Sequence, residues 1–307
     1  MLALESVGRS FGPVVAVEDV GFEVPRGSVC GLIGPNGAGK TTTMRLILGI
    51  CELERGRITW EGQPVDQVER RRLAYVPEER GLYPRMRLED QLRLFGELGG
   101  RSRREAERTA DRWIDRLGLD EYRRRPGSDL SKGNARKAQV AVALLNEPEL
   151  VILDEPFEGL DPVNVRVVWE VLSERTTAGV TFLLSSHTMD FVEGLCDRVV
   201  LINRGRTTVA GALGEVRRQS ARRVLRVGFQ EASEQAFSRF ERATGLGPGR
   251  ADRDGARLYE VDREAASGDP AQRLLDAARA AGPVLLFSLG PPSLEEVYIE
   301  LVGDGAA

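Results

Sequence analysis

The sequence has no long hydrophobic run. The longest apolar stretches, such as AVALL within 140–145 and VTFLL at 180–184, end after about five residues. A helix needs about 20 consecutive apolar residues to span a bilayer, so no membrane-spanning segment is predicted. The first ten residues, MLALESVGRS, also lack the basic start and apolar core of a secretory signal peptide. Any role at a membrane is therefore expected to need a partner.

Cysteine, lysine and histidine are scarce as well. The three cysteines, at 30, 51 and 196, are too few and too scattered for a disulfide framework or a zinc cluster, so we expect buried thiols in a reducing cytosol. Basic residues number 43 and acidic residues 47, for a net charge of −4. General binders of nucleic acid or anionic lipid usually have a basic excess. The only lysines are Lys40, Lys132 and Lys137, and His187 is the only histidine.

Two domains are expected from the length of 307 residues and from an arginine-rich connector at 215–221. In residues 1–214, strands are predicted at 14–24, 29–34, 150–156 and 180–186, and helices at 41–48 and 163–176, with a helical region at about 86–145. This alternation favours an α/β fold with a parallel sheet. Residues 222–307 predict a small α+β domain, with strands at 224–229, 257–261 and 284–289 and helices at 233–243, 270–281 and 293–302.

A glycine-rich loop joins the predicted strand 29–34 to the helix 41–48. Gly34–Thr41 reads GPNGAGKT and fits the phosphate-binding pattern G-x-x-x-x-G-K-[ST]. Its glycines let backbone N–H groups converge on a phosphate, and the helix N-terminus adds partial positive charge. Lys40 is expected to reach the β- and γ-phosphate oxygens, and the Thr41 hydroxyl to hold Mg²⁺. The loop predicts binding of a nucleoside triphosphate.

Two acids end the predicted strand at 150–156, which reads LVILDEP. Beside a phosphate-binding loop, Asp154 is expected to hold the water shell of Mg²⁺. Glu155, the next residue, can polarise an attacking water as general base. An apolar run that ends in two acids is usually only a strand meeting solvent, and it is the neighbouring loop that favours the chemical interpretation.

Five further motifs resemble those of ATP-binding cassette (ABC) proteins, in the order of that family. They are Phe11 at the adenine-stacking A-loop position, Tyr75–Glu78 (YVPE) at the Q-loop, Leu130–Asn134 (LSKGN) at the LSGGQ signature, Gly159–Pro162 (GLDP) at the D-loop and Ser185–His187 (SSH) at the switch histidine. The resemblance covers about residues 2–214. It implies an α/β P-loop NTPase fold of the ABC ATPase type, with antiparallel β and helical subdomains, followed by the C-terminal α+β domain.

The resemblance also implies the site. ATP and Mg²⁺ are the expected ligands, and hydrolysis is expected to use Glu155 as base, His187 on the γ-phosphate and water, and Lys40. The metal is expected near Thr41, Asp154 and Glu78. The residues expected to contact nucleotide are Phe11, Gly34, Pro35, Asn36, Gly37, Ala38, Gly39, Lys40, Thr41, Thr42, Glu78, Ser131, Gly133, Asp154 and Asp161.

Two positions depart from the family pattern. Glu78 stands where the Q-loop has glutamine, and its negative charge would act on the γ-phosphate. Lys132 stands in the signature, which reads Ser-Lys-Gly-Asn instead of Ser-Gly-Gly-Gln, and adds a cation near that helix N-terminus. Ser131 and Gly133 are retained for the contact that the family makes with the opposite subunit's γ-phosphate.

The family further implies a homodimer or heterodimer of ATP-binding subunits that closes head to tail around two ATP molecules. This dimer is expected to drive separate transmembrane permease subunits at the cytoplasmic face of the cell membrane. PEERGLYPRM at 77–86, LSKGN and SLEEVYIELVG at 293–303 resemble a bacterial exporter subfamily with a C-terminal accessory domain, which includes sodium and drug efflux components. No nucleic-acid partner is expected, and the cargo stays open because the membrane subunits determine it.

Three other functions fit the sequence less well than transport does. A non-transport cassette protein that acts on nucleic acid or the ribosome is the main alternative, but such proteins usually carry tandem cassettes, a coiled-coil insertion or zinc cysteines. A GTP switch would need an Asn-Lys-x-Asp guanine motif, which the sequence lacks. A nucleotide sensor without turnover would leave Glu155 and His187 unexplained.

Overall fold

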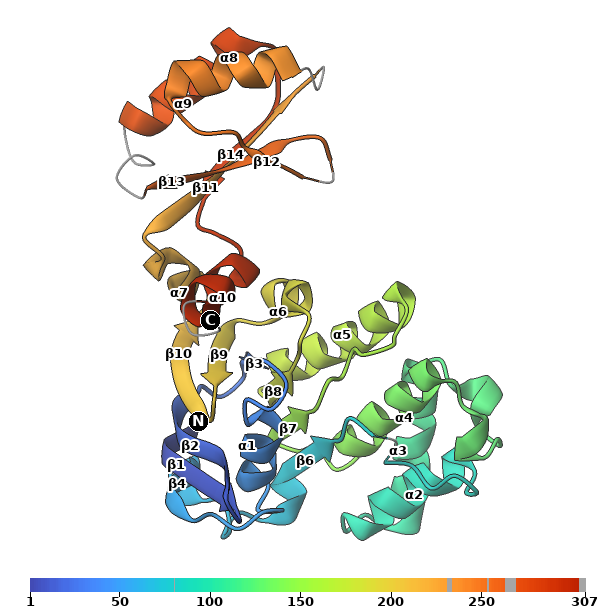
Figure 1. Ribbon diagram of the computed structural model, residues 1–307. Coiled ribbons are helices and arrows are strands. Elements are labelled where there is room, and N and C mark those ends of the chain that lie inside the picture. Colours follow the sequence, from blue (N-terminus) through green and yellow to red (C-terminus); the bar gives the residue numbers. More distant parts are fainter. Residues whose placement is uncertain (80, 231–233, 253, 263–268, 304–307) are drawn as a thin grey trace. The chain divides into compact units, whose positions relative to one another are not determined.

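A computed structural model of the chain describes residues 1–79, 81–230, 234–252, 254–262 and 269–303 (Figure 1). The chain divides into two compact units, Met1–Leu213 and Gly214–Ala307. Ser233, where a helix is predicted to begin, and residues 304–307 of the predicted second domain lie outside the described residues. In the described ranges, no helix has both the length and the apolar character that crossing a membrane requires.

The first unit is built on a ten-stranded sheet with the order β5-β4-β1-β2-β10-β9-β3-β8-β7-β6. Its strands are β1 (Leu2–Phe11), β2 (Val14–Val24), β3 (Val29–Ile33), β4 (Arg55–Trp60), β5 (Gln63–Pro64), β6 (Leu73–Val76), β7 (Leu150–Leu153), β8 (Thr181–Ser185), β9 (Arg198–Asn203) and β10 (Arg206–Ala212). Its helices are α1 (Lys40–Ile47), α2 (Leu88–Leu98), α3 (Arg103–Arg116), α4 (Lys132–Leu144), α5 (Pro162–Thr177) and α6 (Met189–Leu195), with the 3₁₀ turns η1 (Arg70–Arg72), η2 (Asp120–Tyr122) and η3 (Gly127–Asp129).

The parallel part of this sheet positions the site. Strands β3, β7 and β8 are short and mostly apolar, and every residue in them is buried, as expected for strands covered on both faces. Strand β8 pairs in parallel with β3 and with β7, and β7 pairs in parallel with β6. The carboxyl ends of these strands therefore meet at one edge. The glycine-rich loop, the Asp154-Glu155 pair and the Ser185–His187 motif all begin there.

The predicted helical region consists of α2, α3 and α4, which pack against one another and lie together in teal and green in Figure 1. Helix α3 begins at a capping box, because Ser102 accepts a hydrogen bond from the backbone N–H of Glu105 and the Glu105 carboxylate accepts one from that of Ser102. Helix α4 also contacts β6. One end of the helical region is thus fixed to the edge strand of the sheet.

The second unit is a small α+β domain, as predicted. Its elements are α7 (Leu213–Gln219), β11 (Arg222–Phe229), α8 (Glu234–Thr244), β12 (Arg250–Ala251), β13 (Arg257–Asp262), α9 (Asp269–Ala281), β14 (Val284–Gly290) and α10 (Leu294–Gly303). The sheet has the order β12-β13-β11-β14, and its β11 pairs are antiparallel. One face of β11 packs Leu225, Val227 and Phe229 against Phe237 and Phe240 of α8. The segment at 215–221, predicted as a connector, is mostly helical and belongs to α7.

Candidate active site

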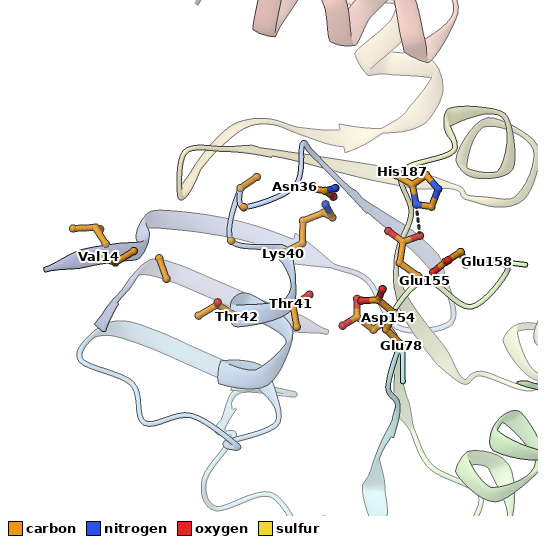
Figure 2. A pocket seen from close by; sticks show the side chains of 15 residues that line it. Val14, Asn36, Lys40, Thr41, Thr42, Glu78, Asp154, Glu155, Glu158 and His187 are labelled. Carbon is orange, nitrogen blue, oxygen red and sulfur yellow. Dashed lines mark hydrogen bonds and ion pairs between the residues drawn. The ribbon is translucent and has the colours of Figure 1, made fainter. Parts of the chain in front are cut away.

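A cleft of about 560 Å³ opens at the carboxyl ends of β3, β7 and β8. It is lined by Val14, Val15, Ala16, Asn36, Gly37, Ala38, Gly39, Lys40, Thr41, Thr42, Glu78, Asp154, Glu155, Glu158 and His187. Figure 2 shows the glycine-rich loop on one side, with Lys40 and Thr41, and the carboxylates and His187 on the other. The cleft therefore has a side suited to phosphate and a side rich in oxygen acceptors.

The glycine-rich loop is shaped by close approaches that exclude side chains. Gly39, which precedes α1, has φ = +104°, and a Cβ there would lie 2.5 Å from the carbonyl oxygen of Ala16. At Gly37, where φ is +79°, no atom lies within 4 Å of the position that a Cβ would take. The loop backbone at Gly37 is therefore open toward the cleft, and it fits a phosphate held by backbone N–H groups at the start of a helix.

Lys40 lies inside this loop. Its Nζ donates hydrogen bonds to the carbonyl oxygens of Gly34, at 2.8 Å, and Pro35, at 3.2 Å. Burial lowers the pKa of the ammonium, while the carboxylates of Glu155, Asp154 and Glu78 oppose this shift. Among the described residues Lys40 forms no ion pair, so phosphate oxygens would be stronger acceptors than its present carbonyl partners.

The two acids after β7 are held by one hydroxyl group. Ser185 Oγ donates to Oδ1 of Asp154 at 2.7 Å and accepts a hydrogen bond from the backbone N–H of Glu155 at 2.8 Å. Asp154 is 2% exposed, and the Tyr75 hydroxyl lies 3.4 Å from its other carboxylate oxygen. Ser185 thus holds the Asp154 carboxylate and the backbone of Glu155 at the end of the strand.

Glu155 has an unusual backbone conformation for a residue with a side chain, with φ = +47°. Such strain is held in place only by its surroundings and is often found at functional sites. The Nδ1 atom of His187 lies 3.0 Å from Glu155 Oε2, and this contact is drawn as a dashed line in Figure 2. Burial raises the pKa of the Glu155 carboxyl, opposed by His187 and Lys40. A carboxylate with a raised pKa is a stronger proton acceptor.

Six predicted site residues lie outside the lining of this cleft. Gly34 and Pro35 begin the glycine-rich loop, where their carbonyl oxygens accept hydrogen bonds from Lys40 Nζ, and the other four lie elsewhere. The Phe11 ring is 47% exposed, and the guanidinium of Arg9 lies over it, 4.9 Å from the ring centroid. Ser131 accepts a hydrogen bond from the Asn134 N–H and begins α4, while Asp161 caps α5. Gly133 is buried near Leu160 and Asn164. Nucleotide contacts by Phe11, Ser131, Gly133 and Asp161 stay predictions.

The structure adds lining residues that the sequence did not predict. Val14, Val15 and Ala16 of β2 reach the cleft because the loop packs on the Ala16 carbonyl. Glu158 adds a fourth carboxylate, and its Oε1 accepts a hydrogen bond from Lys132 Nζ at 3.1 Å. The four acids Glu78, Asp154, Glu155 and Glu158 thus line the cleft together with Lys40, so acidic side chains outnumber basic ones there.

Comparisons with known proteins agree with this arrangement. Residues 17–158 match the ABC transporter family, and residues 211–302 match the C-terminal domain of DrrA1-3-like ATP-binding proteins. The chain is 37% identical to the uncharacterized ABC transporter ATP-binding protein YhaQ of Bacillus subtilis, with 99% of each chain covered. It is 34% identical to the Nod factor export ATP-binding protein I of Sinorhizobium fredii, covering 98% of this chain and 86% of that one.

Among solved structures, an ATP-binding subunit of an ABC transporter superposes with a TM-score of 0.67 and 36% identity, covering 71% of this chain and 92% of that chain. The predicted P-loop NTPase fold of the ABC ATPase type is thereby confirmed. Because the match to the Bacillus protein extends over nearly the full length of both chains, the chain belongs to the ATP-binding proteins of ABC transporters.

Proposed function

We propose that this chain hydrolyses ATP in a head-to-tail dimer and so drives separate membrane subunits, as the energy-coupling part of an exporter. The observation that carries the proposal is the placement of Glu155, with His187 at 3.0 Å, across one cleft from Lys40 and the glycine-rich loop. Glu155 accepts a proton from the attacking water, and His187 orients that carboxylate and contacts the γ-phosphate. Catalysis is positioning together with charge stabilisation.

A magnesium ion fits the donor set of the cleft. Thr41, Asp154 and Glu78 offer a hydroxyl and carboxylate oxygens, which are the ligand type that Mg²⁺ prefers. Across the described part of the chain, no three His, Cys, Asp or Glu side chains gather closely enough to hold a metal alone. We therefore assign the ion to a joint site with the phosphates, where it would offset phosphate charge.

The head-to-tail dimer is supported by the incomplete cleft. Ser131 and Gly133, which the family uses on the opposite subunit's γ-phosphate, do not line the cleft of their own chain. Ser131 is exposed at the start of α4, so it is accessible to a second copy. Phosphate release per chain should therefore rise with protein concentration as dimers form. Turnover that is independent of concentration, in a chain shown to be monomeric by light scattering, would contradict the dimer.

The exporter assignment and the peripheral location at the cytoplasmic face rest on the relatives. A Nod factor export ATP-binding protein aligns over nearly the whole chain, including the second unit. No helix of the described residues could itself cross a membrane, and we place the membrane-spanning part in separate chains. Neighbouring reading frames that encode hydrophobic spans would support the assignment, and we leave the cargo open.

The proposed docking surface for membrane subunits is a shallow cavity of about 670 Å³ lined by Tyr83, Pro84, Arg85, Met86, Arg87 and Asp90. It is braced from α2, because Gln91 accepts from the Tyr83 N–H and donates to the Met86 carbonyl, both at 2.8 Å. The segment continues the chain from Glu78 in the cleft. Movement of the Glu78 region on nucleotide binding would therefore reach this surface.

Charge reversal tests this surface. Arg85→Glu and Arg87→Glu change exposed side chains outside the cleft, so phosphate release by the isolated chain should stay within about twofold while association with the membrane subunits falls about tenfold. Association is measured as the fraction of chain that sediments with membranes of cells that express the neighbouring reading frames. Arg103→Glu, a 74% exposed side chain on α3, is the matched control. Equal loss of turnover and association would contradict this surface.

A further inference from the structure

One helix holds three consecutive carbonyl groups beside the nucleotide cleft. Pro77–Glu79, here called the 77–79 loop, follows β6. Arg136 of α4 donates from Nη1 to the Pro77 carbonyl at 2.7 Å and from Nη2 to the Glu78 carbonyl at 2.9 Å. Gln139, one turn further along α4, donates to the Glu79 carbonyl at 2.8 Å. The backbone that carries the Glu78 side chain is therefore bound to the helix that begins at the signature.

The Arg136 guanidinium is buried without an ionic partner. Only 3% of the residue is exposed, and among the described residues it forms no ion pair with a carboxylate. Burying a charge is costly unless other groups compensate it, so a buried arginine here needs a reason beyond two backbone hydrogen bonds. Burial lowers the pKa of this guanidinium, and the carboxylates of Glu158, Asp154, Glu78 and Glu155 oppose that shift. The charge thus lies within electrostatic reach of the acids that line the cleft.

The acidic side chains of the cleft give a reason for a buried positive charge at Arg136. Four carboxylates line it, and one of them, Glu78, replaces the neutral glutamine of the family pattern. A triphosphate brings further negative charge, and that charge moves onto the γ-phosphate oxygens during hydrolysis. A fixed cation bonded to the backbone of Glu78 would reduce this repulsion, because charges interact strongly where water is excluded.

We propose that Arg136 is a positioning residue that holds the 77–79 loop so that the Glu78 carboxylate faces the cleft, and that its fixed charge compensates that carboxylate during turnover. The proposal rests on the proposed ATPase function and adds a residue to it. Arg136 need not touch nucleotide. It acts through Glu78, and the two residues should therefore be energetically coupled.

A double-mutant cycle tests this coupling. Arg136→Gln removes the charge but keeps a donor, and we expect kcat/KM for ATP to fall about tenfold, the effect of losing one charge-assisted hydrogen bond. Arg136→Lys keeps the charge but lacks the planar guanidinium fork that spans the Pro77 and Glu78 carbonyls, so it should lose less. In the Glu78→Gln background the carboxylate that Arg136 is proposed to compensate is gone. There Arg136→Gln should cost less than about threefold.

A purely structural arginine gives a different result. Its loss would lower kcat/KM by the same factor with Glu78 and with Glu78→Gln, and that additivity would overturn the proposal. Arg166→Gln, an exposed arginine of α5, is the matched control and should leave kcat/KM unchanged. Should Arg136→Gln fail to fold, the same cycle is run with Arg136→Lys, which also loses the two-pronged hold on the 77–79 loop. Additive effects of Arg136→Lys and Glu78→Gln on kcat/KM would equally overturn the proposal.

The proposed ATPase function can be wrong while the coupling of Arg136 to Glu78 is right, and the two outcomes can be told apart. A folded wild-type chain that releases no phosphate from Mg·ATP, even at high protein concentration, would contradict the ATPase function. The cycle is then read from the rise in unfolding temperature on adding Mg·ATP, which reports binding rather than turnover. Non-additive rises across the four variants would support the coupling of Arg136 to Glu78, and additive rises would overturn it.

Discussion

Replacing Glu155 by glutamine should lower phosphate release by about 10²–10⁴-fold, the contribution of a general base, while Mg·ATP still binds. Glutamine keeps the shape of the side chain and its contact with His187, but it cannot accept a proton at this position. Lys40, Thr41 and Asp154 are unchanged and still line the cleft. Release is measured as phosphate formed per chain, and binding by titration with a fluorescent ATP analogue.

The matched control for this variant is Glu158→Gln. Glu158 also lines the cleft, but its carboxylate is partly exposed and paired with Lys132, so its loss should change turnover only severalfold. Near-normal turnover in Glu155→Gln would remove Glu155 from the role of base. It would point to Glu78, the other carboxylate that could activate water.

The pH profile gives an independent check of the same residue. A general base works only when deprotonated, so turnover falls as the pH drops through its pKa. Because burial raises the pKa of Glu155, this fall should occur at higher pH than for an ordinary glutamate, whose pKa is 4.5. An acid limb at or below the ordinary value would contradict the assignment.

Lys40→Ala should weaken Mg·ATP binding by about 100-fold, because it removes charge-assisted hydrogen bonds to phosphate at a buried position. The variant differs in kind from Glu155→Gln, which binds nucleotide but does not turn it over. Arg103→Ala is the control, since Arg103 is exposed on α3, does not line the cleft and should change the dissociation constant less than about threefold. Equal weakening by both changes would mean that Lys40 has no special part in binding.

The local elements around the site could be predicted because each carries its own signal. Gly34–Thr41 combines glycines, a lysine and a helix start, and β7 is an apolar run that ends in two acids. The order of the strands in the sheet could not be predicted, since β3 lies between β8 and β9, which are far from it in the sequence. No strand was predicted for 198–212. Strand β10, RTTVAGA, has only a weak hydrophobic period, whereas the apolar run VVLI of β9 is a strand signal that the prediction missed.

Some features of the site depend on tertiary contacts and have no local pattern. Val14 reaches the cleft because Gly39 packs on the Ala16 carbonyl, which no spacing in β2 reveals. Arg136 is one of many arginines in the sequence, and only its burial against the 77–79 loop distinguishes it. Glu158 follows the Asp154-Glu155 pair closely, and this proximity was the one signal that could have indicated it.

The most direct test of the account is the mass of the Glu155→Gln chain, measured by size-exclusion chromatography with light scattering, with and without Mg·ATP. The account predicts a stable dimer with Mg·ATP that contains one nucleotide per chain, because hydrolysis, the step that reopens the dimer, is blocked. Lys40→Ala should show no such nucleotide-dependent dimer. A Glu155→Gln chain that binds Mg·ATP at full occupancy and remains a monomer would contradict the head-to-tail mechanism.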